Sequence, residues 1–136
     1  LALEQLRRDS HVDPTRVAAI GYCFGGSTVL EMARRGQNLN GVVSFHGALD
    51  TPTPQDARKI KGKILACHGG ADPFVPPEHV AAFQKEMEDA KVDYQFISYG
   101  PGVLHGFTNP DNRNPALKGV AYNEIADRRS WRQSRR

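Results

Sequence analysis

The residues of this chain that could do chemistry begin with a cysteine set between glycines. Cys23 lies in Gly-Tyr-Cys-Phe-Gly-Gly at 21–26, directly after the apolar run 17–20. A strand that ends in G-x-nucleophile-x-G and opens into a helix forms a nucleophile elbow, whose sharp turn holds the nucleophile in strained backbone. We expect a side chain at Gly21 or Gly25 to collide with the adjoining strand or helix. The positive end of that helix favours the thiolate form of Cys23, which is the attacking species.

An aspartate and a histidine each follow a later apolar run. Asp72 comes after the run 64–67, and His105 comes after the run 94–99. In a nucleophilic triad the histidine accepts the proton of the nucleophile, and the carboxylate orients the histidine. Nucleophile, acid and base therefore occur in an order typical of a triad built at the ends of parallel strands.

At these residues the chain resembles the dienelactone hydrolase family of α/β-hydrolases. The matching segments are Gly-Tyr-Cys-Phe-Gly-Gly at 21–26, Gly-Ala-Asp-Pro-Phe-Val-Pro at 70–76 and His-Gly-Phe at 105–107. The resemblance implies that Cys23 is the nucleophile, His105 the base and Asp72 the acid. It also implies hydrolysis of small carboxylic esters or lactones through a thioester acyl-enzyme, with no metal or organic cofactor. The backbone N–H of Phe24, which follows the nucleophile, is the expected oxyanion donor.

Three features of the family's site differ here or would come from outside this sequence. Dienelactone-specific members carry a basic residue four positions after the catalytic histidine, and here that position is Asn109. Arg113 is a candidate replacement from the same loop. The second oxyanion donor and the activating glutamate of the family would belong to a segment that precedes residue 1. We therefore expect a small ester or lactone as substrate rather than dienelactone itself.

Each predicted site residue also has a simpler interpretation. Cys23 is alternatively a small buried residue, Asp72 a cap of the turn that follows it, and His105 an exposed loop histidine. Asp50 follows the apolar run 42–45 and is a rival acid, although the triad of this fold normally uses the next strand.

Other function classes compete with the hydrolase. A metal site would combine thiol and imidazole ligands that suit zinc, although their spacing is not that of a zinc motif: Cys23, His46, Cys67, His68 and His105. Of these, Cys67 is expected in the core, while His46 and His68 either line the cleft or bind backbone groups. A phosphate-binding module would use the glycines of 21–26, but the P-loop Lys-Ser/Thr is missing. The remaining alternative is a catalytically inactive fragment or small-molecule-binding module that needs a partner segment.

The composition narrows the class of protein. The 136 residues suffice for a single domain over 1–136, interpreted as the C-terminal part of a hydrolase domain. The net charge of +3 comes from five arginines near the end of the chain, so no nucleic-acid partner is expected. No apolar stretch approaches the roughly 20 residues of a membrane span. The two cysteines without paired spacing favour a cytoplasmic protein.

The elements that must position these residues alternate between strand and helix. Strands are predicted at 17–20, 42–45, 64–67 and 94–99, and helices at 1–8, 25–35, 77–90 and 116–132. The first three strands are nearly continuous apolar runs, as is typical of strands covered on both faces. This alternation predicts an α/β fold with four parallel strands and flanking helices. The resemblance makes it a partial α/β-hydrolase fold that lacks the N-terminal strands.

The strand at 17–20 would then lie at an open edge of the sheet. An unpaired apolar edge strand is a template for association with another strand. Besides a small ester or lactone, we therefore expect a homo-oligomer or a strand-swapped assembly through this edge.

Overall fold

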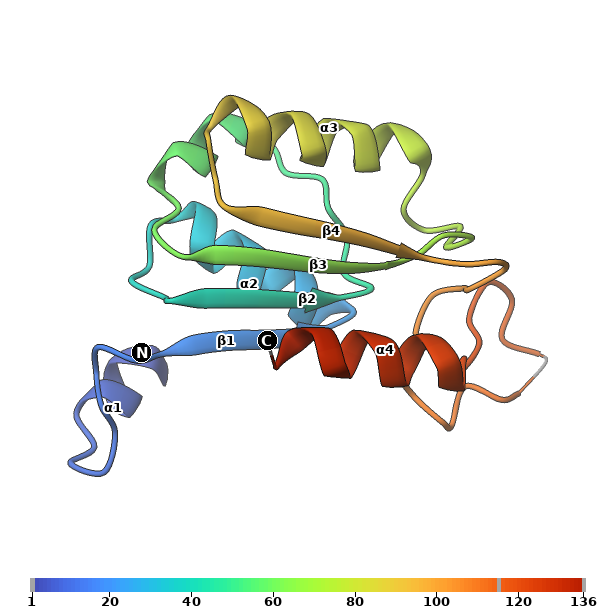
Figure 1. Cartoon of the computed structure of the whole chain (residues 1–136), viewed down its shortest axis with the longest axis horizontal. Coiled ribbons are helices and arrows are strands. Elements are labelled where there is room, and N and C mark those ends of the chain that lie inside the picture. Colours follow the sequence, from blue (N-terminus) through green and yellow to red (C-terminus); the bar gives the residue numbers. More distant parts are fainter. Residues whose placement is uncertain (1, 115, 136) are drawn as a thin grey trace.

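Four parallel strands form one sheet, in which their order is the order of the sequence (Figure 1). The computed structural model describes residues 2–114 and 116–135. The strands are β1 Ala18–Tyr22, β2 Gly41–Phe45, β3 Lys63–Gly69 and β4 Tyr94–Tyr99. Because all the strands run the same way, the loops that follow them meet at one end of the sheet. The prediction of four parallel strands with flanking helices is confirmed.

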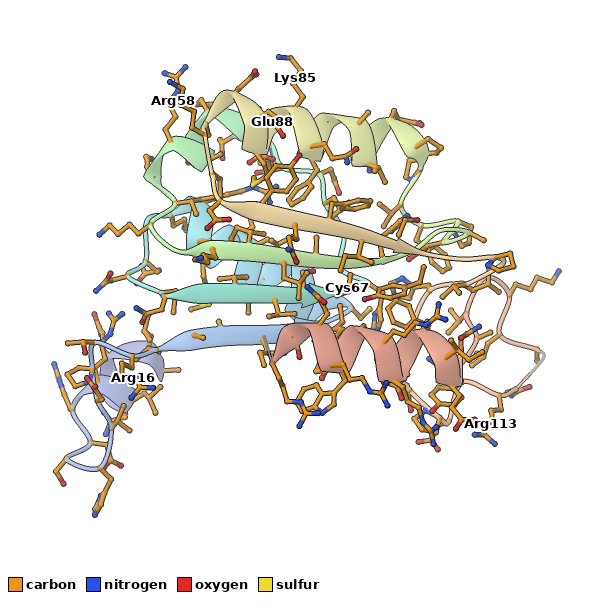
Figure 2. All side chains as sticks on the ribbon, in the orientation of Figure 1. Arg16, Arg58, Cys67, Lys85, Glu88 and Arg113 are labelled. Carbon is orange, nitrogen blue, oxygen red and sulfur yellow. The ribbon has the colours of Figure 1, made fainter. Side chains whose placement is uncertain are left out.

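Helices cover both faces of this sheet. The helices of the chain are α1 Ala2–Arg7, α2 Phe24–Arg34, the 3-10 helix η1 Pro54–Lys59, α3 Pro77–Asp89 and α4 Glu124–Ser134, of which α1 has no buried residue and lies off the sheet (Figure 1). α2 and α3 share one core cluster with strand residues such as Val42 and Ile64. α4 packs in front of the sheet through Ala126, in a cluster with Cys67 and Tyr99 (Figure 1). Cys67 therefore lies inside the molecule, whereas Lys85 extends from the outer side of α3 (Figure 2).

The last helix begins later than the predicted start at residue 116. α4 starts at Glu124, after Asn123 accepts a hydrogen bond from the backbone N–H of Ala126 at 2.9 Å. Before this cap, Gly119 adopts a φ of 78° and Val120 pairs with His105. A positive φ and a side-chain N-cap both prevent a helix from continuing, so the prediction was wrong over this stretch.

The edge position of β1 is confirmed, but its expected burial on both faces is wrong. The side chains of Ile20 and Tyr22 are 48% and 45% exposed. In the part of the chain that the structure describes, β1 pairs with β2 alone. One margin of the sheet therefore presents apolar side chains and an unpaired strand to solvent.

Candidate active site

Cys23 occupies the sharp turn between β1 and α2. Its backbone has φ 52° and ψ −120°, which confirms the predicted strain, and the residue is exposed. Its N–H donates to the carbonyl oxygen of Phe45 at 3.0 Å and to Nδ1 of His46 at 3.2 Å. Two acceptors from the end of β2 thus hold the cysteine in this conformation.

Glycines allow the close packing of this turn, but not all at the predicted positions. A Cβ on Gly21 would overlap the backbone of Gly25, and one on Gly26 would lie 2.6 Å from Oγ of Ser44. At Gly25, by contrast, no described atom lies within 4 Å of such a Cβ. The predicted collision is therefore confirmed at Gly21 and wrong at Gly25, because the first turn of α2 directs that position outward.

Cys23, His105 and Asp72 lie in one hydrogen-bonded row. Nε2 of His105 is 3.1 Å from Sγ of Cys23, and Nδ1 of His105 is 2.8 Å from Oδ2 of Asp72. The other carboxylate oxygen of Asp72 accepts the backbone N–H of Phe74 at 2.9 Å. Asp72 thus caps the turn, as its simpler interpretation held, and also contacts the histidine.

The electrostatics of this row favour a charged histidine. The hydrogen bond to Asp72 outweighs partial burial and, with the contact to Cys23, raises the pKa of His105 to about 9. Burial alone would raise the pKa of Asp72, but hydrogen bonds from His105 and from the backbone of Phe74 lower it. An imidazolium beside a carboxylate is therefore the favoured state near neutral pH.

The loop between β4 and α4 holds His105 over the cysteine. Gly106 has a φ of 65°, and its carbonyl accepts a hydrogen bond from Nδ2 of Asn112 at 2.8 Å. Phe107 is fully buried and anchors the loop in the core. His105 is therefore fixed by the two residues that follow it in the sequence.

His46, left open by the sequence, lies directly behind this row. Its Nε2 is 2.8 Å from Oγ1 of Thr108, and its ring meets that of His105 edge-on at 5.2 Å. Burial, together with repulsion from His105, lowers the pKa of His46 to about 4. The ring is therefore neutral where His105 is charged.

His68 lies apart from the row. It packs against Phe96 and lines a separate cavity of about 500 Å³ that also reaches Asp72. Among the described residues its Nδ1 has no hydrogen-bond partner, and burial lowers its pKa. His68 is thus no part of the Cys23 surface.

A cleft of about 800 Å³ opens in front of Cys23 and His105. Its walls include side chains that sequence reasoning did not single out: Tyr22, Thr108, Leu117, Val120, Asp127 and Trp131. Apart from Tyr22, which ends β1, these residues take their places from the irregular loop and from the late start of α4, which no local motif indicated. Asn109 also lines this cleft, as its distance from His105 in the sequence suggested.

Arg113, the candidate replacement for a basic residue, has another partner. Its guanidinium stacks on the ring of Tyr122 at 5.1 Å, and the hydroxyl of Tyr122 donates to Asp127 at 3.1 Å. Figure 2 shows Arg113 beyond the N-terminal end of α4, away from the sheet. The structure thus gives no support for Arg113 as a substrate contact.

The rival residues are separate from the Cys23 row. Asp50 lies 3.7 Å from Nδ1 of His79 on the solvent side, so it is not the partner of His105. Cys67 is buried, as expected, and burial raises the pKa of its thiol to about 11. Within residues 2–114 and 116–135, no three acidic, histidine or cysteine side chains are placed to hold a metal ion. In the same residues no helix is long and apolar enough to cross a membrane.

Comparison with known proteins identifies relatives of this chain. The model of the Dienelactone hydrolase family matches residues 1–135. An uncharacterised protein of Caenorhabditis elegans is 37% identical in an alignment of 136 positions that covers 96% of this chain and 84% of that protein. A carboxymethylenebutenolidase homolog of Xenopus tropicalis is 25% identical over 84% of this chain and 45% of its own length.

Two solved structures share both fold and sequence with the chain. The protein named m3DLH has a TM-score of 0.92 at 42% identity and is covered over 55% of its length. A dienelactone hydrolase-like promiscuous phosphotriesterase from metagenomic libraries has a TM-score of 0.89 at 41% identity, with the same coverage. Both matches include 98% of this chain. The chain thus spans about 55% of the length of each of these two structures.

Proposed function

The chain belongs to the dienelactone hydrolase family, and we propose that it cleaves small carboxylic esters or lactones with Cys23 as nucleophile. The observation that carries this proposal is the position of His105 between two partners. One ring nitrogen lies 3.1 Å from the thiol and the other 2.8 Å from Asp72. That spacing suits proton transfer between the thiol and an oriented imidazole.

The acylation step starts from the ion pair in which the proton of the Cys23 thiol is already on His105, so that a thiolate faces an imidazolium. The thiolate forms a carbon–sulfur bond with the ester carbonyl, whose π electrons move to oxygen. The backbone N–H of Phe24, at the start of α2, donates to this oxyanion. The tetrahedral intermediate then collapses to a thioester and expels the alkoxide, which takes the proton from His105.

In the deacylation step, His105 accepts a proton from water. The resulting hydroxide attacks the thioester carbonyl, and the carbon–sulfur bond breaks to release the carboxylic acid. The thiolate released on Cys23 and the proton kept on His105 restore the ion pair from which the next cycle starts. Asp72 holds the imidazole in the tautomer and orientation that both steps need.

The cleft favours a small substrate without a carboxylate. Asn109 stands where a cation would bind a carboxylate, and Asp127 adds an anionic side chain to the wall. Tyr22, Leu117 and Trp131 offer apolar and aromatic surface for the body of the ester. We also place the protein in the cytoplasm, where free cysteines stay reduced.

Hydrolysis of a p-nitrophenyl ester by the wild type, Cys23→Ala and Cys67→Ala tests this proposal. We expect Cys23→Ala to lose at least about 10³-fold in rate, because the nucleophile is gone. Cys67→Ala is the matched control, since its buried thiol lies outside the cleft, and it should keep wild-type turnover. Mass spectrometry of the quenched wild type should show the acyl group on Cys23.

Two outcomes would contradict the proposal. Equal rates for the wild type and Cys23→Ala would remove Cys23 as nucleophile. Absence of turnover in all three proteins would support the competing function, an inactive fragment or binding module that needs a partner segment.

A further inference from the structure

His46 connects the nucleophile to the substrate cleft through two different hydrogen bonds. Its Nδ1 lies 3.2 Å from the backbone nitrogen of Cys23, and its Nε2 lies 2.8 Å from Oγ1 of Thr108. A backbone N–H can only donate, so Nδ1 must be the acceptor and the ring proton must sit on Nε2. His46 therefore donates to the hydroxyl oxygen of Thr108.

The surroundings of His46 keep it in this neutral form. The side chain is 4% exposed and packs edge-on against Phe107 and against His105, both at 5.2 Å. Tyr22 lies across the ring at 6.1 Å. The charged groups nearby are the imidazolium of His105, which opposes a second positive charge, and the carboxylate of Asp72, which attracts one. Burial and the charge of His105 outweigh the attraction of Asp72. His46 therefore stays neutral, and its Nδ1 remains an acceptor.

This arrangement directs the proton of Thr108 away from His46. One lone pair of Oγ1 accepts Nε2–H, and the hydroxyl hydrogen needs a different partner. Among the residues that the structure describes, no such partner is present. Thr108 lines the same cleft as Cys23 and His105. Its hydroxyl is thus an oriented and unused hydrogen-bond donor at the substrate site.

We propose that the hydroxyl of Thr108 binds a second oxygen of the substrate, and that His46 positions this hydroxyl. The second oxygen is distinct from the carbonyl oxygen under attack, which faces the N–H of Phe24. The preferred substrates are esters that carry an ether, hydroxyl or carbonyl oxygen in the acyl or alcohol arm. A site built to donate a hydrogen bond discriminates against an analogue that lacks the acceptor. This inference rests on the proposed ester hydrolysis.

Matched esters test the role of Thr108. The acyl pair is p-nitrophenyl methoxyacetate and p-nitrophenyl butyrate; the alcohol pair is methoxyethyl acetate and butyl acetate. Each pair differs by one oxygen in place of a methylene. For each pair we take the kcat/KM of the ester with the extra oxygen divided by the kcat/KM of the ester without it. Comparing this ratio between the wild type and Thr108→Val cancels the intrinsic reactivity of the esters. We expect Thr108→Val to lower this ratio about 3- to 10-fold in one pair. Thr108→Ser should keep it.

Two substitutions at His46 separate its two hydrogen bonds. His46→Asn keeps an acceptor for the N–H of Cys23 but does not reach Thr108, and it should lower the ratio as Thr108→Val does. His46→Gln keeps a donor for Thr108 but loses the acceptor at the elbow. It should slow both esters of a pair equally and leave the ratio unchanged. Combining His46→Asn with Thr108→Val should lower the ratio no further, since both changes break one chain of hydrogen bonds.

Distinct results would overturn this inference or the proposed function. An unchanged ratio in both pairs for Thr108→Val excludes the substrate contact, and an unchanged ratio for His46→Asn excludes the positioning role. Absence of Cys23-dependent turnover means that the proposed function fails. The hydrogen-bond chain is then read from the ring nitrogens of His46 by ¹⁵N NMR. A proton on Nε2 that responds to Thr108→Val supports the chain, and a proton on Nδ1 overturns it.

Discussion

At the scale of single residues, Asp72 combines two tasks in one carboxylate. One oxygen accepts the N–H of Phe74 at 2.9 Å, and the other contacts His105 at 2.8 Å. Asparagine keeps an oxygen for the turn but places an amide or a neutral oxygen against the imidazole. Asp72→Asn therefore removes the charge that stabilises His105 while it preserves the turn.

We expect Asp72→Asn to lower kcat/KM about 10²- to 10⁴-fold, because the imidazole loses its orienting partner. The pH profile should change as well. Catalysis by an imidazolium acid declines as His105 loses its proton, which in the wild type happens at a pKa of about 9. Without the hydrogen bond to Asp72 that pKa falls, so the alkaline limb should move to lower pH.

Asp50→Asn is the matched control for this prediction. It makes the same chemical change at the rival acid, which lies beside His79 on the solvent side. The pH–rate profile of Asp50→Asn should overlay that of the wild type. A loss in Asp50→Asn with none in Asp72→Asn would reverse the assignment of the acid.

The meeting of Cys23, Asp72 and His105 in one place could be predicted because each stands in a local motif after a strand. His46 and Thr108 could not be assigned in this way. Their partnership depends on the path of the loop after β4, where His105 pairs with Val120 and Phe107 is buried. Contacts of this kind join residues far apart in the sequence, and no periodic pattern records them.

At the scale of elements, a buried ion pair ties α2 to α3. Nε of Arg34 and Oε1 of Glu86 are 2.8 Å apart, and a second bond of 2.8 Å joins the other ends of the two groups. Burial alone would lower the pKa of Arg34, but the bonds to Glu86 outweigh it and raise that pKa. Arg34 also donates to the carbonyl of Leu49 and to Oε1 of Glu31, so each of its three guanidinium nitrogens has a partner in the protein.

We expect Glu86→Ala to lower the free energy of unfolding by about 3 kcal/mol, because it leaves the guanidinium of Arg34 buried without its main partner. Urea denaturation followed by circular dichroism measures this loss. Lys85→Ala is the control on the same helix. Lys85 pairs with Asp89 on the exposed side at 2.7 Å, and its removal should cost at most about 0.5 kcal/mol. Similar losses in both variants would contradict the role of the buried pair.

Element positions could be predicted more reliably than the surroundings of each element. The strand at Tyr94–Tyr99 and the helix at Pro77–Asp89 lie where the apolar patterns indicated. The burial of β1 was wrong, because an apolar run is typical of a covered strand and does not reveal an edge. The start of the last helix was wrong because Asn123 caps it only after an irregular loop.

At the scale of the whole molecule, the sheet formed by the described residues has β1 at one margin and β4 at the other. β1 is the more apolar margin, where Ile20 and Tyr22 are about half exposed. The chain covers 55% of the solved structure named m3DLH, whose fold it shares. Antiparallel pairing of β1 with β1 of a second copy would join two sheets about a two-fold axis. We propose that β1 of a second copy covers the open edge in this way.

Ile20→Lys tests the pairing, because a lysine on an edge strand opposes association with another strand. We expect the wild type to associate with rising concentration in analytical ultracentrifugation, and Ile20→Lys to remain monomeric. Ile125→Lys is the matched control: Ile125 is 63% exposed on α4, so the same change there should leave the association intact. Loss of association in Ile125→Lys alone would assign the contact to α4. A wild type that is monomeric at every concentration would exclude a second copy as the occupant of the edge.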